Sequence, residues 1–376
     1  MKTYTKIIVL LLVTSTVLAQ KNIPIIKAIS DKVSIRLGEK FYENQWTVIP
    51  EANPDVYDVS EIGKTVTFYT DVDSISVNIN EKTNFDFIIL LNNKDTAYTK
   101  IKYKESYLSI LKKAKEYDYN QSRNLPKFTY QDSSDVKLKQ IKKEFNLDSI
   151  AGNGNEISKL LNMMHWVHNI VRHDGSSNSP TLKNAIDLVK VCQAENRGIN
   201  CRMMAIVLNE CYLSMGYKSR MITCMPKPLE FNDCHVINTV FSKQLNKWVW
   251  LDPTFDAYVM NEKGELLGLQ EVRERLINDK PLILNPDANW NRQSSQTKEH
   301  YLYNYMAKNL YRLEIPVHST YNYETKEKGK TIEYIQLLPL DGINQNPKVK
   351  LVKGNNNEIT YKTYITNNPN TFLEKE

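Results

Sequence analysis

The sequence lacks most of the short motifs that mark metal, redox and nucleic-acid sites. Its five cysteines include no Cys-x-x-Cys pair, which disfavours a zinc ribbon and a thioredoxin-like redox centre. It has no tract of clustered lysine and arginine with interleaved aromatic residues, so nucleic acid is not an expected partner. Beyond residue 20 no apolar stretch is long enough to cross a bilayer, and no repeat of solenoid period occurs.

The overall composition is that of a soluble globular protein. Hydrophobic residues make up 41% and charged residues 24% of the 376 residues, which is close to ordinary domain averages. A chain of this length has room for two or three domains. The formal net charge of +6 is too small to indicate a polyanionic partner.

The first nineteen residues have the three parts of a secretory signal peptide. Lys2 and Lys6 form a positive n-region, and residues 7–13 form an apolar h-region that is too short for a membrane span. Val17-Leu-Ala19 fits the small-residue rule for cleavage after Ala19. We therefore expect a mature protein that is periplasmic or secreted, with no membrane span once the leader is removed.

The five cysteines all lie in one central region of the chain. They are Cys192, Cys201, Cys211, Cys224 and Cys234. Export would place them in a compartment that permits disulfides, and the odd count leaves at least one thiol unpaired. If Cys201 is that thiol, the other four allow three pairings, and the sequence does not choose among them.

Residues 20–104 have the pattern of a small β-sandwich. Short segments that alternate or are β-branched recur along them, separated by turn-rich pieces. These segments are 33–37, 65–69, 74–79 and 85–91. Because no cluster of acids, histidines or glycines suggests chemistry, we expect an accessory module. Residues 105–134 are predicted to be a linker with some helix.

Residues 135–290 are predicted to form an α+β domain, with helices first and an antiparallel sheet after them. The apolar spacing follows the helical period and then changes to that of strands. Helices are expected over 156–171, 182–192 and 202–215. Strands are expected over 219–224, 235–241 and 247–251. Residues 291–376 are expected to add a C-terminal helix and a strand extension.

Three segments of this domain supply a thiol, an imidazole and a carboxylate in chain order. Cys201 directly precedes an apolar helix, where backbone N–H groups and the helix dipole stabilise a thiolate. His235 begins a strand, and Asp252 ends the next strand before a proline. The seventeen residues between them fit a strand, a hairpin loop and a return strand, so we expect Asp252 to accept the Nδ1–H of His235. These are the groups that activate a nucleophile.

Each of the three residues also has a plainer interpretation when it is taken alone. Cys201 fits a buried structural cysteine. His235 fits a satisfied histidine of the core, and Asp252 fits a residue that forms a turn. The hypothesis of an active site depends on the three side chains meeting in space.

A second constellation lies on the helix before the cysteine region. His165 and His168 are three residues apart, with His173 nearby, and this spacing can converge on a metal ion. A metal-dependent hydrolase is therefore a third hypothesis. The segment lacks the glutamate and the spacing of His-Glu-x-x-His, so we predict a packed helix and no metal or cofactor.

The three segments together resemble the transglutaminase-like superfamily over residues 155–258. The resemblance is carried by Cys201 at a helix start, His235 on a strand and Asp252 in Trp-x-Leu-Asp-Pro-Thr. The resemblance implies a papain-like fold with a Cys-His-Asp triad. In it Cys201 is the nucleophile, His235 is the base and acid, and Asp252 orients the imidazole. It also implies Trp166, thirty-five residues before the cysteine, as a candidate donor to an oxyanion, although core packing also fits its helix.

The chain departs from that family near the nucleophile. Gly198 lies three residues before Cys201, where many members have glycine two residues before it, and Arg202 stands where calcium-dependent animal enzymes usually have tryptophan. No acidic loop has calcium-binding spacing. These departures favour hydrolysis over amine transfer, with peptide, glycopeptide or cell-wall amides as substrates. The alternative is an exported, non-catalytic binding or scaffold protein that retains the fold, with Cys201 in a disulfide.

Overall fold

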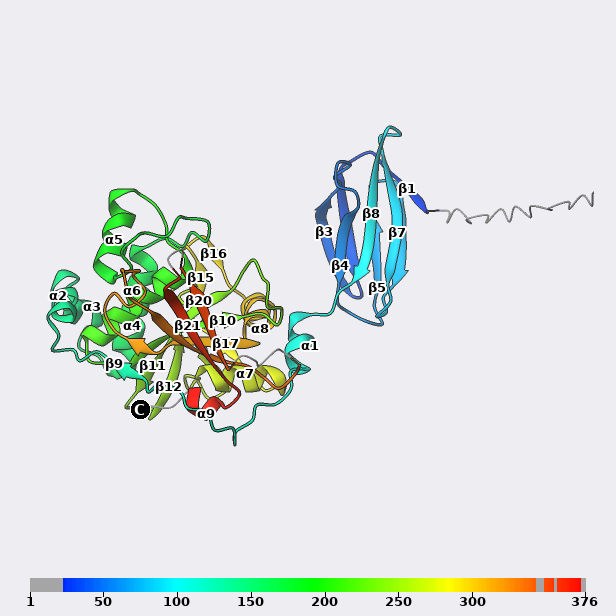
Figure 1. Ribbon diagram of the computed structural model, residues 1–376. Coiled ribbons are helices and arrows are strands. Elements are labelled where there is room, and N and C mark those ends of the chain that lie inside the picture. The colour runs from blue at the N-terminus through cyan, green and yellow to red at the C-terminus, as the bar shows by residue number, and fades with distance from the viewer. Residues whose placement is uncertain (1–22, 343–347, 355–356, 373–376) are drawn as a thin grey trace, which may run out of the picture. The chain divides into compact units, whose positions relative to one another are not determined.

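The computed structural model describes residues 23–342, 348–354 and 357–372 (Figure 1). The predicted signal peptide, residues 1–19, lies outside the described residues. Contacts within the chain divide it into two units, Met1–Glu105 and Ser106–Glu376. In the described ranges, no helix combines the length and apolar composition that a bilayer span requires.

The first unit is a sandwich of two four-stranded sheets, which confirms the predicted β-sandwich. The sheets have the strand orders β1-β7-β8-β4 and β3-β2-β5-β6. The strands are β1 (Ile25–Ala28), β2 (Lys32–Leu37), β3 (Lys40–Thr47), β4 (Asp55–Val59), β5 (Thr65–Tyr69), β6 (Ser74–Asn78), β7 (Asn84–Leu91) and β8 (Asp95–Tyr103). Alternate residues of β2 and β8 are buried, so one face of each sheet forms the core. Phe68 and Phe87 join the two sheets, with 5.4 Å between ring centroids.

The second unit contains all the predicted site residues. Its helices are α1 (Tyr107–Lys112), α2 (Val136–Glu144), α3 (Leu147–Ala151), α4 (Glu156–Ile170), α5 (Ala185–Ala194), α6 (Cys201–Ser214), α7 (Leu269–Ile277), the π-helix η1 (Glu299–Met306), α8 (Ala307–Asn309) and α9 (Pro369–Phe372). Its main sheet has seven strands in the order β12-β11-β10-β17-β19-β21-β20.

The strands of that sheet come from both halves of the unit. They are β10 (Ser219–Met225), β11 (His235–Ser242), β12 (Lys247–Leu251), β17 (Arg312–Pro316), β19 (Ile332–Leu337), β20 (Val349–Lys353) and β21 (Ile359–Thr366). Short pairs join β9 (Thr129–Tyr130) to β18 (His318–Ser319), β13 (Val259–Met260) to β14 (Ile283–Leu284), and β15 (Asn289–Trp290) to β16 (Ser294–Ser295).

This arrangement confirms the α+β class, with helices first and the sheet after them. The predicted strands pair antiparallel, as β10 with β11 and β11 with β12, whereas β19 and β21 of the C-terminal extension run parallel. Residues of the predicted C-terminal extension also pair directly with the predicted domain, since β17 lies beside β10. The sheet therefore continues across residue 290.

Alternate residues of the central strands pack into two cores, one on each face of the sheet. On β11, Val236 and Val240 join a core formed with α4, α5 and α6, whereas Ile237 joins a core formed with α7 and η1. Trp250 of β12 lies in that second core. Burial on both faces explains why β10 and β11 are buried at every position.

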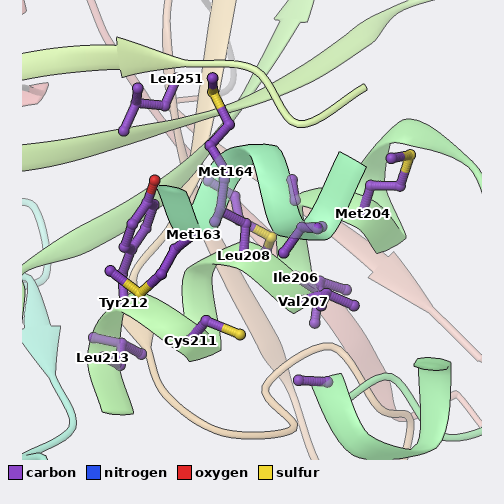
Figure 2. Packing of buried hydrophobic residues seen from close by; sticks show 14 of the residues in the cluster. Met163, Met164, Met204, Ile206, Val207, Leu208, Cys211, Tyr212, Leu213 and Leu251 are labelled. Carbon is purple, nitrogen blue, oxygen red and sulfur yellow. The ribbon is translucent and has the colours of Figure 1, made fainter. Parts of the chain in front are cut away.

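Helix α6 is the most deeply packed helix near the site, and it begins at Cys201. The side chain of Asn200 caps it by accepting a hydrogen bond from the backbone N–H of Met203 (3.1 Å). All residues from Met203 to Ser214 are buried. Figure 2 shows Met163 and Met164 of α4 among the side chains of this core. The helix ends before Gly216, whose φ of +80° closes it in the left-handed conformation.

Truncation of this core should lower the stability of the protein markedly. Leu208 on α6 is completely buried (Figure 2), and Leu208→Ala is expected to cost about 2–5 kcal/mol because it removes apolar burial and leaves a cavity. The exposed Val136→Ala is the control, with a change of about 0.5 kcal/mol or less. Urea unfolding measures both. Equal midpoints for the two variants would contradict this packing.

Candidate active site

Cys201 occupies the first position of α6 and is partly exposed to solvent. The first backbone N–H groups of a helix lack partners within the helix, and together with the helix dipole they favour a negative charge at this end. Asn200 holds the helix start in place through its side-chain cap. The thiol therefore has the setting that the sequence predicts.

His235 begins β11 and Asp252 directly follows β12, its neighbour in the sheet, and both residues are completely buried. In the β11–β12 register Asn238 pairs with Leu251, so the next position places Asp252 near Ile237 and diagonal to His235 on the same face. The His235 Nε2 atom is 2.7 Å from Asp252 Oδ2. The prediction that Asp252 accepts from Nδ1 is wrong, because the carboxylate bonds Nε2.

The carboxylate of Asp252 is held by two further donors. Its Oδ1 accepts from the backbone N–H of Thr254 (2.9 Å), and its Oδ2 accepts from the hydroxyl of Tyr301 on η1 (2.6 Å). A buried carboxylate needs such partners, because an unpaired charge in the interior is costly. Asp252 is thus fixed in position as a partner for the imidazole.

The thiol and the imidazole shift each other's ionisation. Burial opposes ionisation of Cys201, but hydrogen bonds from His173 and His235, together with electrostatic attraction from these rings, outweigh it and lower the pKa of the thiol to about 6. Burial also disfavours charge on His235, but the Asp252 carboxylate and the thiolate raise the pKa of the imidazole to about 10. Between these values a thiolate and an imidazolium coexist.

An aromatic wall encloses His235. Its ring centroid is 5.5 Å from Phe255 and 5.2 Å from Tyr305, and the Tyr305 hydroxyl is 3.4 Å from His235 Nδ1. Tyr301 and Tyr305 both come from η1, a segment that the sequence analysis treated as an extension. The closely spaced tyrosines 301, 303 and 305 on one predicted helix were the available signal.

A hydrogen bond from His173 also lowers the pKa of Cys201, a role that the sequence pattern did not predict. The backbone on either side of His173 pairs with Ile199, two residues before Cys201. Asp174 N–H donates to Ile199 O (2.8 Å), and Ile199 N–H donates to Arg172 O (2.9 Å). This pairing brings the imidazole beside the start of α6. In the sequence, His173 is instead considered with His165 and His168 as part of a metal site.

Gly198 permits that close pairing. A Cβ atom at this position would lie 2.6 Å from Asp174 Cβ and 2.7 Å from Arg172 O. Gly198→Ala is therefore expected to destabilise the protein by about 1–3 kcal/mol and to raise the pH midpoint for alkylation of Cys201. Gly175→Ala is the matched control, since its Cβ would meet His173 only at 3.7 Å. A Gly198→Ala variant with the wild-type unfolding midpoint would contradict the tight fit.

The histidines of the metal hypothesis have other partners. His165 Nδ1 is 2.6 Å from Asp256 Oδ2. Both ring nitrogens of His168 are occupied, by Pro253 O at 3.0 Å and by Asn289 Oδ1 at 2.9 Å. Across the described ranges, no group of three or more histidine, cysteine, aspartate or glutamate side chains is placed to hold a metal ion.

Trp166, the candidate oxyanion donor, packs on the helical side of the unit. Its ring lies 5.1 Å from that of Phe145, and it adjoins the core of α4 to α6. The contacts described for its ring are thus with the core, as plain packing predicts. The structure does not bring it together with Cys201, His235 and Asp252 through any described contact.

All five cysteines lie in the described part of the chain, and all are free thiols. Burial raises the pKa of Cys192, Cys211 and Cys224, and it raises the pKa of Cys234 to about 11. Cys201 differs from the others because its pKa is lowered. The disulfide that the scaffold alternative assigned to Cys201 is not formed.

Arg202, the residue after the nucleophile, forms an ion pair with Glu324. Its guanidinium donates to Glu324 Oε1 (2.5 Å) and to Thr223 Oγ1 (2.7 Å). The hydroxyl of Tyr334 donates to the same carboxylate oxygen (3.0 Å). These contacts tie the start of α6 to the C-terminal strands.

Comparisons with known proteins give fold likenesses only. No family model matches the sequence, and no curated protein matches it. Solved structures similar to parts of the chain include a proposed cysteine protease from Cytophaga hutchinsonii, with 21% identity over 40% of this chain and 48% of that chain and a TM-score of 0.24.

Two further solved structures are similar to larger parts of the chain. Red sea bream transglutaminase has 10% identity over 67% of this chain and 52% of its own, with a TM-score of 0.24. A proposed protease from Parabacteroides distasonis has 13% identity over 59% of this chain and 38% of its own, with a TM-score of 0.22. This chain spans about half or less of the length of these three structures. At these identities and TM-scores they identify no family or activity for it.

Proposed function

We propose that this chain is an exported cysteine enzyme of transglutaminase-like type that acts on amide bonds through a thioester. The observation that carries the proposal is the connected set of Cys201, His235 and Asp252. A hydrogen bond from the imidazole lowers the pKa of the thiol, and the imidazole itself hydrogen-bonds a buried carboxylate at 2.7 Å. A thiol alone is a common core residue, whereas a thiolate with an imidazolium and an orienting carboxylate is an activated nucleophile.

The reaction begins with the proton of Cys201 on His235. The thiolate attacks the carbonyl carbon of an amide, and the backbone N–H groups at the start of α6 stabilise the oxyanion. The C–N bond then breaks as His235 donates its proton to the leaving amine, which leaves a thioester on Cys201. Asp252 keeps the imidazole oriented and stabilises its charged form.

The second half of the reaction releases the acyl group. His235 takes a proton from water, the resulting hydroxide attacks the thioester carbonyl, and the C–S bond breaks to give a carboxylic acid and the thiolate. A substrate amine in place of water would make the reaction a transfer. We propose hydrolysis, because Arg202 stands after the nucleophile and no calcium-type acidic loop is present in the sequence.

The substrate class follows from the proposed export. The leader at residues 1–19 indicates a periplasmic or secreted enzyme. Peptides, glycopeptides and cell-wall amides are the amides found in that setting, and we propose them as substrates.

Product analysis in H₂¹⁸O tests this function. Peptide and glycopeptide libraries are incubated with the mature chain and with Cys201→Ala. Hydrolysis is expected to put ¹⁸O into a new carboxyl group and to release an amine, with no product from the variant. An added primary amine that appears in the product would instead show transfer. Equal product from Cys201→Ala, or binding without any product, would contradict the enzyme and favour the scaffold alternative.

A further inference from the structure

His173 is the second imidazole at Cys201, and a tight turn holds its backbone. Its N–H donates to Asn291 Oδ1 (2.7 Å), and its carbonyl accepts from Asn291 Nδ2 (2.9 Å). Asn291 and Arg292 have φ values of 53° and 61°. The turn between β15 and β16 is therefore strained, and it places the Asn291 amide against the backbone of His173. The position of the ring beside α6 is therefore fixed from two distant segments.

Trp290, the last residue of β15 before this turn, fixes which nitrogen of His173 carries the proton. The indole N–H of Trp290 donates to His173 Nδ1 (3.1 Å), and the two rings meet edge to face. An indole nitrogen is only a donor, so Nδ1 must accept. The neutral ring then carries its proton on Nε2. If Nδ1 also carried a proton, its N–H would face the N–H of Trp290.

The two histidines at the thiol therefore have opposite partners. His235 bonds a carboxylate, which stabilises an imidazolium and suits a base that becomes an acid. His173 bonds an N–H donor, which leaves a neutral ring with one fixed N–H. Hydrogen bonds from both rings lower the pKa of Cys201. One ring can move a proton, and the other can only donate a hydrogen bond.

We propose that His173 is a catalytic residue whose Nε2–H bonds the sulfur of Cys201 in the resting enzyme and the oxyanion during acyl transfer, with Trp290 as the residue that positions it. The inference rests on the function proposed above. When the carbonyl carbon bonds the sulfur, the oxyanion lies next to that sulfur. It is then within reach of donors that surround it, which are the start of α6 and His173.

Two chemical probes separate this role from a structural one. p-Nitrophenyl acetate acylates the thiolate through an oxyanion, whereas iodoacetamide alkylates it without one. At a pH where Cys201 is fully ionised, His173→Leu is expected to lower the acylation rate about 10²- to 10³-fold and to change alkylation little. A merely structural role would lower both rates together, and that result would overturn the proposal.

Two more variants test the donor and its support. His173→Gln retains an N–H and is expected to recover at least about tenfold of the acylation rate lost in His173→Leu. Trp290→Phe retains an aromatic ring without the N–H, so it is expected to slow acylation in the wild type and to add nothing in His173→Leu. Additive losses, or no rescue by glutamine, would overturn the proposal.

The tautomer can also be read in the unaltered protein. ¹⁵N NMR of the labelled chain is expected to show His173 with a proton on Nε2 and none on Nδ1 at neutral pH, and any other state overturns the proposal even if a variant fails to fold. If Cys201 of the wild type is not acylated at all, the proposed function itself fails. If Cys201 is acylated and His173→Leu keeps the wild-type ratio of acylation rate to alkylation rate, only the inference about His173 fails.

Discussion

Cys201→Ala is expected to lower amide cleavage by about 10⁶-fold, because removal of the nucleophile of such a triad costs about as much as removal of the whole triad. The fold should persist. Cys201 is a partly exposed first residue of α6, alanine favours helix, and the Asn200 cap does not involve the thiol. The measurement is kcat for an amide found in the library screen, with circular dichroism to check the fold.

The matched control for that variant is Cys192→Ala. Cys192 lies in the core of α4 to α6, and burial raises the pKa of its thiol. Its loss is expected to lower the unfolding midpoint slightly and to leave kcat near the wild-type value. More than about a hundredth of the wild-type activity in Cys201→Ala would contradict covalent catalysis by this thiol.

Asp252→Asn is expected to lower kcat by about 10⁴-fold with the fold retained. The amide has nearly the same shape, but it removes the negative charge that raises the pKa of His235. The imidazole then loses its preference for the charged, correctly oriented form. The positive charge on His235 also stabilises the thiolate of Cys201. Its loss should therefore move the pH midpoint for alkylation of Cys201 upward from about 6.

A neighbouring carboxylate provides the control for that change. Asp256 is also buried and also bonds a histidine, at 2.6 Å from His165, but His165 is largely exposed and is not one of the three proposed site residues. Asp256→Asn should leave kcat within a few-fold of the wild type. Similar losses in the two variants would mean that Asp252 acts only through folding.

The sequence predicts that the three central residues lie near one another, and local features account for this. Cys201 lies where a polar segment enters an apolar helix, and the seventeen residues from His235 to Asp252 fit one hairpin. The observed β11–β12 register makes the two residues diagonal neighbours. Local period and spacing determine these features, so they can be read from one sequence. The same holds for the sandwich strands, whose alternation is visible directly.

Other parts of the site depend on contacts between segments that are far apart in the chain. Trp290 meets His173 across 117 residues, and Tyr301 meets Asp252 across 49 residues. No local pattern specifies such pairs. The choice of Nε2 over Nδ1 at Asp252 depends on a side-chain rotation that strand spacing does not determine. The parallel pairing of β19 with β21 likewise arises from tertiary packing.

The pH at which Cys201 reacts is a sharper probe of the thiolate than its rate at neutral pH. At pH 7 a thiol of ordinary pKa is a few per cent ionised, and one near 6 is about nine-tenths ionised. A low pKa also reduces the nucleophilicity of the thiolate, by roughly tenfold here. These effects largely cancel at pH 7. At pH 5.5 the difference in ionisation is about 200-fold, so it dominates.

The most direct test is therefore the rate of iodoacetamide addition to each cysteine as a function of pH, followed by peptide mapping. The account predicts that Cys201 alone reacts at pH 5.5, with a midpoint at about 6, and that His235→Ala moves this midpoint upward. A midpoint for Cys201 near the ordinary value of about 8.5, unchanged in His235→Ala, would contradict the thiolate–imidazolium pair on which the proposed function depends.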